Sequence, residues 1–301
     1  MISDDLQQQI NKIILWLNSH GVAEYSFPIF KQTSKNSNEL QECPAYRWQK
    51  SKFASRIHPI WNLPEITLDS LIGIDIQKQR IVENTEFFLN GQRTNNVLLT
   101  GARGSGKSSL IRALLNKYYQ QGLRVIEVDR ESIGDWHNLV ELLQKQEQNQ
   151  QKYILFFDDL SFEQDEYQYK SLKSLLDGGF EVLPKNAIIY ATSNRRHLVS
   201  EEFKDNLSYH QSEKGEIHPG EVVEEKISLS DRFGIWLSFY SIDQETYWLI
   251  CKQWLTNYGY KIKQTEEEKI KTEAIRWALN RGGRNGRIAE QFARYYCASC
   301  I

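Results

Sequence analysis

The chain has 301 residues, of which 40% are hydrophobic and 25% are charged, the composition of an ordinary globular protein. Its formal net charge of −2 gives no overall basic field that would hold a nucleic acid or an acidic membrane surface. The four cysteines include a C-x-x-C pair at positions 297 and 300, but no second pair of ligands stands at a suitable spacing. We therefore expect reduced thiols and no structural zinc.

No segment of the sequence has the pattern of a targeting or membrane-spanning element. Asp4 and Asp5 stand where a signal peptide would carry basic residues. The most apolar short runs, residues 13–17 and 153–157, are far shorter than the roughly 20 residues that cross a bilayer. We therefore expect a cytoplasmic protein that does not contact a membrane.

Residues 1–64 are expected to form an N-terminal arm. Apolar residues recur at intervals of three and four over residues 1–20, which predicts an amphipathic helix that ends near Gly21. Residues 31–64 are first rich in Ser, Asn and Gln and then carry aromatic residues among prolines. We expect an irregular segment there, packed by its aromatic side chains.

Residues 65–242 are expected to form an α/β core, because short apolar strands alternate with helical segments. This order is typical of a parallel sheet that helices cover on both faces. The expected strands are residues 96–100, 123–128, 153–157, 187–191 and 235–239, and the expected helices are residues 76–89, 110–119, 139–143 and 171–176.

Residues 243–301 change to a wholly helical pattern, with expected helices over residues 244–256, 266–280 and 286–297. We therefore expect a small α-helical lid domain after the core. Residues 198–228 are expected to be an insertion in the core, richer in acidic residues than in lysine. Such an insertion is either a solvated loop or a contact for a partner.

Residues 101–108 satisfy the phosphate-loop motif G-x-x-x-x-G-K-[ST] in full, between an apolar strand and a helix. Glycines allow the backbone N–H groups to surround an anion, and the following helix presents its positive end to the same place. Lys107 would reach the β- and γ-phosphates, and the Ser108 hydroxyl would bind Mg²⁺. The residues expected to bind ATP here are Gly101, Ala102, Arg103, Gly104, Ser105, Gly106, Lys107, Ser108 and Ser109.

Asp158 and Asp159 directly follow the apolar strand at residues 153–157. In phosphate-loop ATPases the first acid in this place holds Mg²⁺, and we expect this of Asp158. Asp159 would act as the general base that polarises the attacking water. A solvated end of the strand is the alternative interpretation.

Asn194 follows the strand at residues 187–191, which should lie beside the strand that carries the two acids. A polar amide at this point resembles sensor 1 of the AAA+ ATPases, which orients the attacking water. A turn-forming asparagine is the alternative. Upstream, residues 71–75, which include Ile72 and Gly73, resemble the segment that packs on adenine in AAA+ proteins.

Two arginines resemble further AAA+ site residues. Arg232, just before the strand at residues 235–239, looks like the arginine finger, which stabilises γ-phosphate charge in the neighbouring subunit. The alternative is a structural turn with Asp231. Arg287 resembles sensor 2, which reaches back across the nucleotide, and Arg284 is the second choice for that role.

Several long strings resemble one group, the bacterial AAA+ family designated DUF815, over about residues 65–298. They are residues 74–80, 95–104, 158–163, 189–197, 215–220 and 224–234. The resemblance implies the AAA+ fold and ATP hydrolysis, but it implies no substrate, because none is established for the family.

The leading hypothesis is therefore an AAA+ ATPase that hydrolyses ATP to ADP and phosphate with Mg²⁺ and works as a homo-oligomer, with Arg232 at the subunit junction. Its cycle would drive a conformational change in the oligomer or in an unknown protein or nucleic-acid partner. The alternative is an ATP-dependent loader or scaffold that hydrolyses little. A GTPase is disfavoured because the chain has no N-K-x-D motif, and a small-molecule kinase because it leaves Arg232 and Arg287 unexplained.

Overall fold

The computed structural model describes residues 43–50, 55–146, 150–160, 166–177, 182–194, 210–211, 217–218 and 231–299. The chain divides into Met1–Glu42 and Cys43–Ile301, and all of the described residues belong to the second unit. The helix expected over residues 1–20 and most of the insertion at residues 198–228 lie outside the described residues. Within that insertion, β7 (His210–Gln211) and β8 (Ile217–His218) pair antiparallel.

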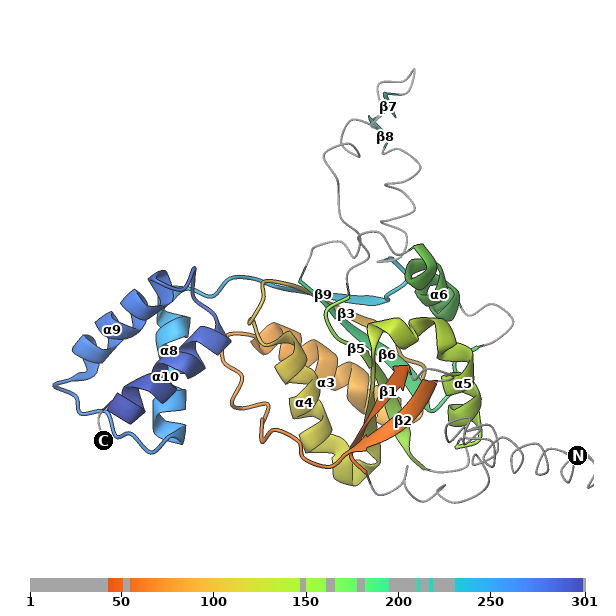
Figure 1. Cartoon of the computed structure of the whole chain (residues 1–301), viewed down its shortest axis with the longest axis horizontal. Coiled ribbons are helices and arrows are strands. Elements are labelled where there is room, and N and C mark those ends of the chain that lie inside the picture. Colours follow the sequence, from red (N-terminus) through yellow and green to blue (C-terminus); the bar gives the residue numbers. More distant parts are fainter. Residues whose placement is uncertain are drawn as a thin grey trace, which may run out of the picture. The chain divides into compact units, whose positions relative to one another are not determined.

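A seven-stranded sheet in the order β2-β1-β4-β5-β6-β3-β9 forms the centre of the second unit (Figure 1). Its strands are β1 (Ala45–Lys50), β2 (Ser55–Ile60), β3 (Val97–Gly101), β4 (Leu123–Val128), β5 (Lys152–Phe157), β6 (Ala187–Ser193) and β9 (Ile235–Phe239). Every neighbouring pair is parallel except β1 with β2. The carboxyl ends of β3, β5 and β6 therefore lie at one edge of the sheet.

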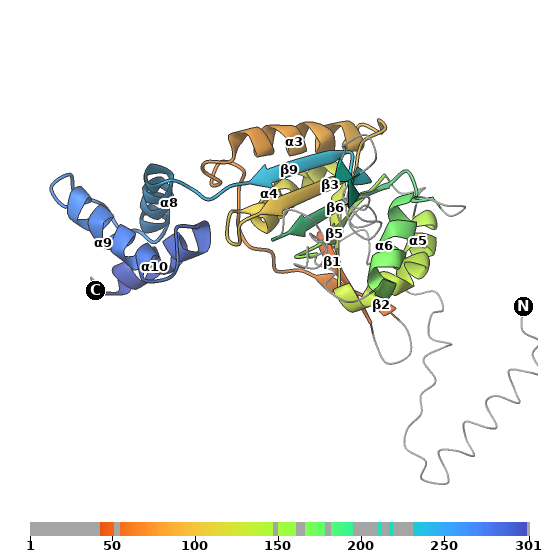
Figure 2. The ribbon, with the colours of Figure 1, turned by 90° about the horizontal axis from the view of Figure 1, so that it is seen from above.

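Helices cover both faces of this sheet. Consecutive residues along β3 and β5 are therefore buried, whichever face they point to. The helices are α3 (Asp75–Leu89), α4 (Lys107–Tyr118), α5 (Trp136–Gln144) and α6 (Glu166–Asp177), with short 3-10 segments η2 (Tyr119–Gln121) and η3 (Arg130–Asp135). α3 and α4 lie on one side of the strands, and α5 and α6 lie on the other (Figure 2).

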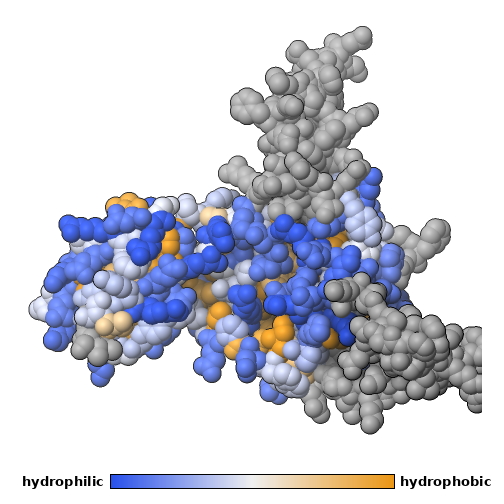
Figure 3. Space-filling view, in the orientation of Figure 1, coloured by the Kyte–Doolittle hydropathy of each residue, from blue (hydrophilic) through white to orange (hydrophobic). Residues whose placement is uncertain are grey.

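The alternation of side chains along the strands explains how the helices pack. Leu99 and Ile154 share a core with Ile81 of α3 and Leu114 of α4. The intervening residues Leu98 and Leu155 are buried outside this core, as are most of the leucines of α5 and α6. In the space-filling view, hydrophilic residues cover most of the described surface that faces the viewer (Figure 3). The predicted strands and helices of the α/β core are thus confirmed, with their ends shifted by a few residues.

The three C-terminal helices form where the periodicity predicts them, as α8 (Gln244–Asn257), α9 (Glu267–Leu279) and α10 (Gly286–Ser299). They share a hydrophobic core of their own, which includes Tyr247, Leu255, Ile270 and Phe292. Asp243 caps α8, since its carboxylate accepts a hydrogen bond of 2.7 Å from the Thr246 N–H. The division of the chain into an arm, a core and a lid at residues 64 and 242 stays a prediction.

The structure corrects one expectation about the segment before residue 64. Residues expected to be irregular form β1 and β2, and β1 pairs in parallel with β4. Tyr46 and Trp48 are buried, whereas Arg47 between them is exposed and donates a hydrogen bond of 2.9 Å to Glu127 of β4. This alternation is a strand pattern that the neighbouring prolines concealed.

The two edge strands of the sheet each carry a feature that limits further pairing. β9 forms one edge, and the Gln77 side chain of α3 donates a hydrogen bond of 2.8 Å to the Ser238 carbonyl on it. β2 forms the other edge and contains Pro59, which has no backbone N–H to donate. Within the part of the chain that the structure describes, none of the helices is both long and apolar enough to span a bilayer.

Candidate functional site

The loop between β3 and α4 has the backbone conformation that its glycines predict. Gly101 has a φ of +129°, and a Cβ atom there would lie 1.9 Å from the Phe239 carbonyl oxygen of β9. Gly104 has a φ of +76°, and a Cβ atom there would lie 2.7 Å from the Asn285 side chain. A side chain at Gly101 would clash with the backbone of β9, and one at Gly104 would clash with Asn285; both positions also have a positive φ, which favours glycine.

Lys107 is the first residue of α4, and its side chain folds back over the loop. Its ammonium group donates hydrogen bonds to the carbonyl oxygens of Gly101 (2.7 Å) and Ala102 (2.9 Å), and to Asn194 Oδ1 (3.0 Å). The residue is only 6% exposed. Burial lowers the pKa of Lys107, and the nearby carboxylates of Asp159 and Asp158 partly oppose this change. The site thus holds a poorly hydrated cation, which a polyphosphate chain would stabilise.

Asp158 directly follows β5, and its side chain is hydrogen-bonded to residues of α4 and β6. Its Oδ1 atom accepts hydrogen bonds from the hydroxyl groups of Ser108 and Thr192, each of 2.6 Å. A hydroxyl and a carboxylate in contact are the oxygen ligands that suit Mg²⁺. Among the described residues, no three His, Cys, Asp or Glu side chains cluster to hold a metal. Sites that bind Mg²⁺ with substrate phosphates commonly use one or two carboxylates and several water molecules.

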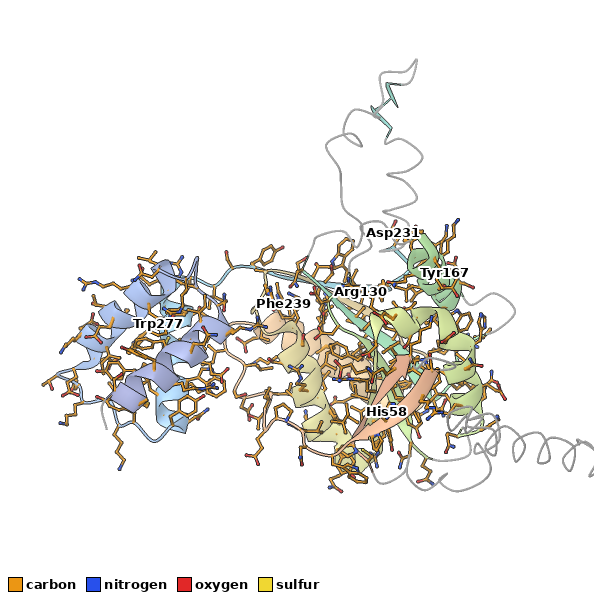
Figure 4. All side chains as sticks on the ribbon, in the orientation of Figure 1. His58, Arg130, Tyr167, Asp231, Phe239 and Trp277 are labelled. Atoms are coloured by element: carbon orange, nitrogen blue, oxygen red, sulfur yellow. The ribbon has the colours of Figure 1, made fainter. Side chains whose placement is uncertain are left out.

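Asp159 lies in the left-handed region, with a φ of +55°, and is the one non-glycine residue in the described segments with a positive φ. Its backbone N–H donates to Thr192 Oγ1 (2.8 Å), and its Oδ1 accepts from Asn194 Nδ2 (2.5 Å). Its carbonyl oxygen accepts a hydrogen bond from Arg130 of η3, which is labelled in Figure 4. Asn194 therefore connects Lys107 with Asp159.

These side chains open onto a cavity of about 650 Å³. Of the residues expected from the sequence, its lining contains Ile72, Arg103, Gly104, Ser105, Gly106, Lys107, Ser108, Ser109, Asp158, Asp159, Asn194 and Arg287. Gly101 and Ala102 are not in the lining; their carbonyl groups accept hydrogen bonds from Lys107. Gly73 is not in the lining either; a Cβ atom added there would lie 2.5 Å from the Thr246 side chain of α8.

Apolar residues form another part of the lining, and most of them were not expected from the sequence. Ile74, which ends the segment before α3, and Ile242, Ile250 and Trp254, in or near α8, line the cavity. Ile74 belongs to the expected adenine segment at residues 71–75, but Ile242, Ile250 and Trp254 carry no motif, since isoleucines and a tryptophan are typical of any core. Only the fold shows that they share a cavity with the phosphate loop.

The start of α10 contacts the phosphate loop directly. The Gly286 N–H donates a hydrogen bond of 2.9 Å to the Gly104 carbonyl oxygen, and Asn285 caps the helix by accepting a bond of 3.0 Å from the Ile288 N–H. Arg287 follows at once and lines the cavity. The side chain of Arg284 instead donates to the Ile242 carbonyl oxygen at 3.4 Å. The structure therefore brings Arg287, and not Arg284, to the cavity.

Arg232 is not in the lining of this cavity. Its guanidinium group forms an ion pair with Asp177 at the end of α6. The region can be found in Figure 4 by the labels on Asp231, which precedes Arg232, and on Tyr167 of α6. The alternative interpretation of the sequence pairs Arg232 with Asp231 in a turn, whereas this ion pair is made with Asp177. The role of Arg232 as an arginine finger concerns a second copy of the chain and stays a prediction.

A parallel sheet with a phosphate loop between β3 and α4, acids after β5 and an amide after β6 defines an AAA+ P-loop fold, so the predicted fold class is confirmed. The chain belongs to the family described as "Protein of unknown function (DUF815)", whose model matches residues 41–300. The resemblance noted in the sequence is thereby confirmed. No curated protein matches the chain.

Among solved structures, C. elegans PCH-2 is similar with a TM-score of 0.50 and 15% identity, covering 74% of this chain and 63% of that one. The Thermotoga maritima RuvB Holliday junction branch migration motor has a TM-score of 0.48 and 16% identity, covering 76% and 63%. The FIGL-1 AAA domain in complex with ADP has a TM-score of 0.48 and 18% identity, covering 79% and 74%. This chain thus spans less than two thirds of the RuvB and PCH-2 chains, and the likeness is one of fold alone.

Proposed function

We propose that the protein binds ATP with Mg²⁺ in the cavity beside the phosphate loop and hydrolyses it to ADP and phosphate. One observation carries this proposal: Lys107, Ser108, Asp158, Asp159 and Asn194 come from three separate segments and form one connected group at the carboxyl edge of the sheet. These are the cationic, hydroxyl, carboxylate and amide groups that phosphoryl transfer requires. A chance arrangement of surface residues would not bury the lysine among them.

The phosphate loop and Lys107 would bind the polyphosphate chain. The loop supplies backbone N–H groups at the positive end of α4, and Lys107 would exchange its bonds to Gly101 and Ala102 for bonds to phosphate oxygens. Ser108 and Asp158 would hold Mg²⁺. The ion would neutralise the negative charge that develops on the phosphates. The apolar side chains of Ile72, Ile74 and Trp254 would contact the base.

Asp159 is proposed as the general base and Asn194 as the residue that orients the attacking water. The hydrogen bond between their side chains places the carboxylate and the amide together beside Lys107. A general base in this position takes a proton from water as the water attacks the γ-phosphate. Asp159 has a shorter side chain than glutamate, so its reach to the water depends on the left-handed turn that it occupies.

Arg232 and Arg287 are proposed to complete the site when copies of the chain assemble into a homo-oligomer. Arg287 would contact the phosphates of its own chain, whereas Arg232 would leave Asp177 and enter the site of a neighbour. We assign residues 1–64 to an arm, residues 65–242 to the ATP-binding core and residues 243–301 to a lid. The use of ATP would place the protein in the cytoplasm.

A second candidate function is an ATP-controlled loader or scaffold with little hydrolysis. The ion pair between Arg232 and Asp177 favours it, because a finger held within its own chain does not stabilise a transition state elsewhere. In this case ATP would act as a switch through the contact of α10 with the phosphate loop.

The deciding experiment measures the rate of ATP hydrolysis per subunit against protein concentration, with ATP binding measured in parallel. A rate that rises steeply with concentration supports a site completed by a neighbour. Tight ATP binding with negligible turnover at every concentration supports the loader or scaffold. A protein that does not bind ATP with Mg²⁺ would exclude both functions.

A further inference from the structure

Thr192 of β6 is bonded to both acids at the end of β5. Its side chain is buried, with 1% of its surface exposed. The hydroxyl donates to Asp158 Oδ1 (2.6 Å) and accepts from the Asp159 N–H (2.8 Å). Because a hydroxyl has one hydrogen and two lone pairs, it makes both bonds at once. The Thr192 carbonyl oxygen also accepts from the Leu160 N–H at 2.7 Å, so this residue contacts three consecutive residues.

The turn that these bonds hold is an unfavourable one for a residue with a side chain. The φ of +55° at Asp159 lies in the left-handed region, which L-amino acids other than glycine seldom occupy. Such a conformation persists only where surrounding contacts determine it. The Thr192 hydroxyl fixes the N–H side of Asp159, Arg130 fixes its carbonyl, and Asn194 fixes its carboxylate.

We propose that Thr192 is a positioning residue that orients Asp158 toward Mg²⁺ and holds Asp159 in its turn. This inference rests on the proposed binding of ATP with Mg²⁺. Loss of the hydroxyl removes one of the two donors to Asp158 Oδ1 and leaves the Asp159 N–H without its acceptor. Asp158 is then free to rotate away from Ser108, and the turn at Asp159 relaxes. Mg²⁺ affinity therefore falls, although Thr192 does not itself bind the ion.

Partners that orient a metal ligand alter metal affinity or activity by about 10- to 100-fold when they are removed. The inference thus predicts that nucleotide binding will need a higher Mg²⁺ concentration. The affinity of the phosphate loop for phosphate in the absence of Mg²⁺ should not change. Lys107 and the loop glycines make no bond to the Thr192 hydroxyl. A merely structural threonine would instead lower stability and leave the dependence on Mg²⁺ as it was.

The test compares Thr192→Val, which keeps the shape but not the hydroxyl, with Thr192→Ser, which keeps the hydroxyl. Ser193→Ala is the matched control, since Ser193 is also buried and its hydroxyl donates to the Leu160 carbonyl oxygen at 2.8 Å. Binding of a fluorescent ATP analogue is titrated for each full-length variant, first with EDTA and then over a range of Mg²⁺ concentrations. Thermal unfolding is measured alongside.

For Thr192→Val we expect the affinity for the ATP analogue in EDTA to lie within about twofold of the wild-type value. The Mg²⁺ concentration that gives half of the full Mg²⁺-dependent increase in affinity should rise about 10- to 100-fold. Thr192→Ser and Ser193→Ala should keep the wild-type dependence on Mg²⁺. If Thr192→Val does not fold, Thr192→Cys replaces it, because a thiol is a weaker donor. The Mg²⁺ concentration that the Cys variant requires should then be higher than that of the Ser variant.

The outcomes separate this inference from the proposed function. Wild-type dependence on Mg²⁺ in Thr192→Val, or in Thr192→Cys where that variant replaces it, overturns the role of Thr192 and leaves the proposed function standing. An equal shift in Ser193→Ala also overturns it, because the effect would then be general to the loop. Wild-type protein whose nucleotide binding does not respond to Mg²⁺ overturns the proposed function, and this inference with it.

Discussion

The phosphate-loop edge of the sheet and the region of Arg232 differ in how their charged groups are partnered. At the phosphate-loop edge, Lys107 is buried and bonded to backbone carbonyls and to Asn194. Arg232 instead pairs with Asp177 at the surface, and their side chains are 24% and 43% exposed. The first group is fixed by the fold, whereas the second is held by a partly solvated ion pair.

This difference indicates which functions one copy of the chain would perform by itself. Partly exposed ion pairs contribute little to stability, so the pair with Asp177 by itself holds Arg232 only weakly. Removing one partner from the hydrogen-bonded group around Lys107 costs more free energy. The remaining buried polar atom then has neither water nor a protein partner to bond with. We therefore expect ATP binding to need residues of one copy only, and turnover to depend on Arg232 from a second copy as well. The following predictions test that separation, from the largest expected effect to the smallest.

Replacing Arg232 with alanine should lower kcat by about 1,000- to 100,000-fold, the range for arginine fingers, while ATP affinity changes little. The reason is that the guanidinium would act only on the charge of the transition state in a neighbouring site. Steady-state ATPase assays at high protein concentration measure this effect, and Arg80→Ala, at an exposed position on α3, is the matched control.

A mixing experiment sharpens the same prediction. Arg232→Ala retains its own phosphate loop, and Lys107→Ala retains its arginine, so mixing the two inactive variants should restore part of the activity. No recovery on mixing, together with a parental rate for Arg232→Ala alone, would show that Arg232 only pairs with Asp177.

Replacing Asp159 with asparagine should lower kcat by about 100- to 10,000-fold, the usual contribution of a general base. Asparagine retains the size of the side chain but does not accept the proton of water. ATP should remain bound, and rapid-quench assays should detect unhydrolysed ATP on the protein. Glu83→Gln, an exposed carboxylate on α3, is the control. Hydrolysis at the parental rate would remove Asp159 from this role.

Replacing Lys107 with alanine should weaken ATP binding by about 100-fold, or about 3 kcal/mol, because charge-assisted hydrogen bonds to the phosphates are lost. Isothermal titration calorimetry measures the change. Lys117→Ala is a suitable control, since Lys117 lies on the same helix but pairs with Glu86 at 3.6 Å. An unchanged affinity for ATP would contradict the assignment of the loop.

Replacing Trp254 with alanine should weaken ATP binding by about 10-fold, since contact of an aromatic ring with a base contributes about 1 to 3 kcal/mol. The affinity for tripolyphosphate, which has no base, should not change. Trp61→Ala removes an exposed tryptophan that is not in the cavity lining and provides the control. An equal loss for ATP and tripolyphosphate would place Trp254 away from the base.

Much of the site could be predicted because its residues follow motifs at the ends of strands. Lys107, Asp158 and Asn194 follow β3, β5 and β6, and the carboxyl ends of parallel strands meet at one edge. The sequence therefore indicates their proximity without any knowledge of their contacts. The strands themselves are predictable for the same reason, since strands buried on both faces are continuous apolar runs.

Thr192, Arg130 and Asp177 could not be found in this way. Their bonds reach across 34, 29 and 55 positions of the chain to Asp158, Asp159 and Arg232. A threonine at the end of a strand or an arginine after one is common in any protein. Only the packing of β4, β5, β6 and α6 decides which of these residues contact the site.

The β1–β2 pair was missed for a different reason. Pro44 and Pro59 border or enter these strands, and proline normally argues against a strand inside a sheet. β2 tolerates Pro59 because it is an edge strand and pairs with β1 alone. The alternation of Tyr46 and Trp48 with Arg47 was the available signal, and it is only a few residues long.

The modified edges of the sheet also have a consequence for how copies of the chain can associate. An unprotected edge strand is a template on which another strand adds, which leads to aggregation. The Gln77 amide occupies a carbonyl on β9, and Pro59 removes a donor from β2, so each edge lacks part of the ladder that an incoming strand needs. Copies of the chain would therefore not readily associate by joining their sheets edge to edge.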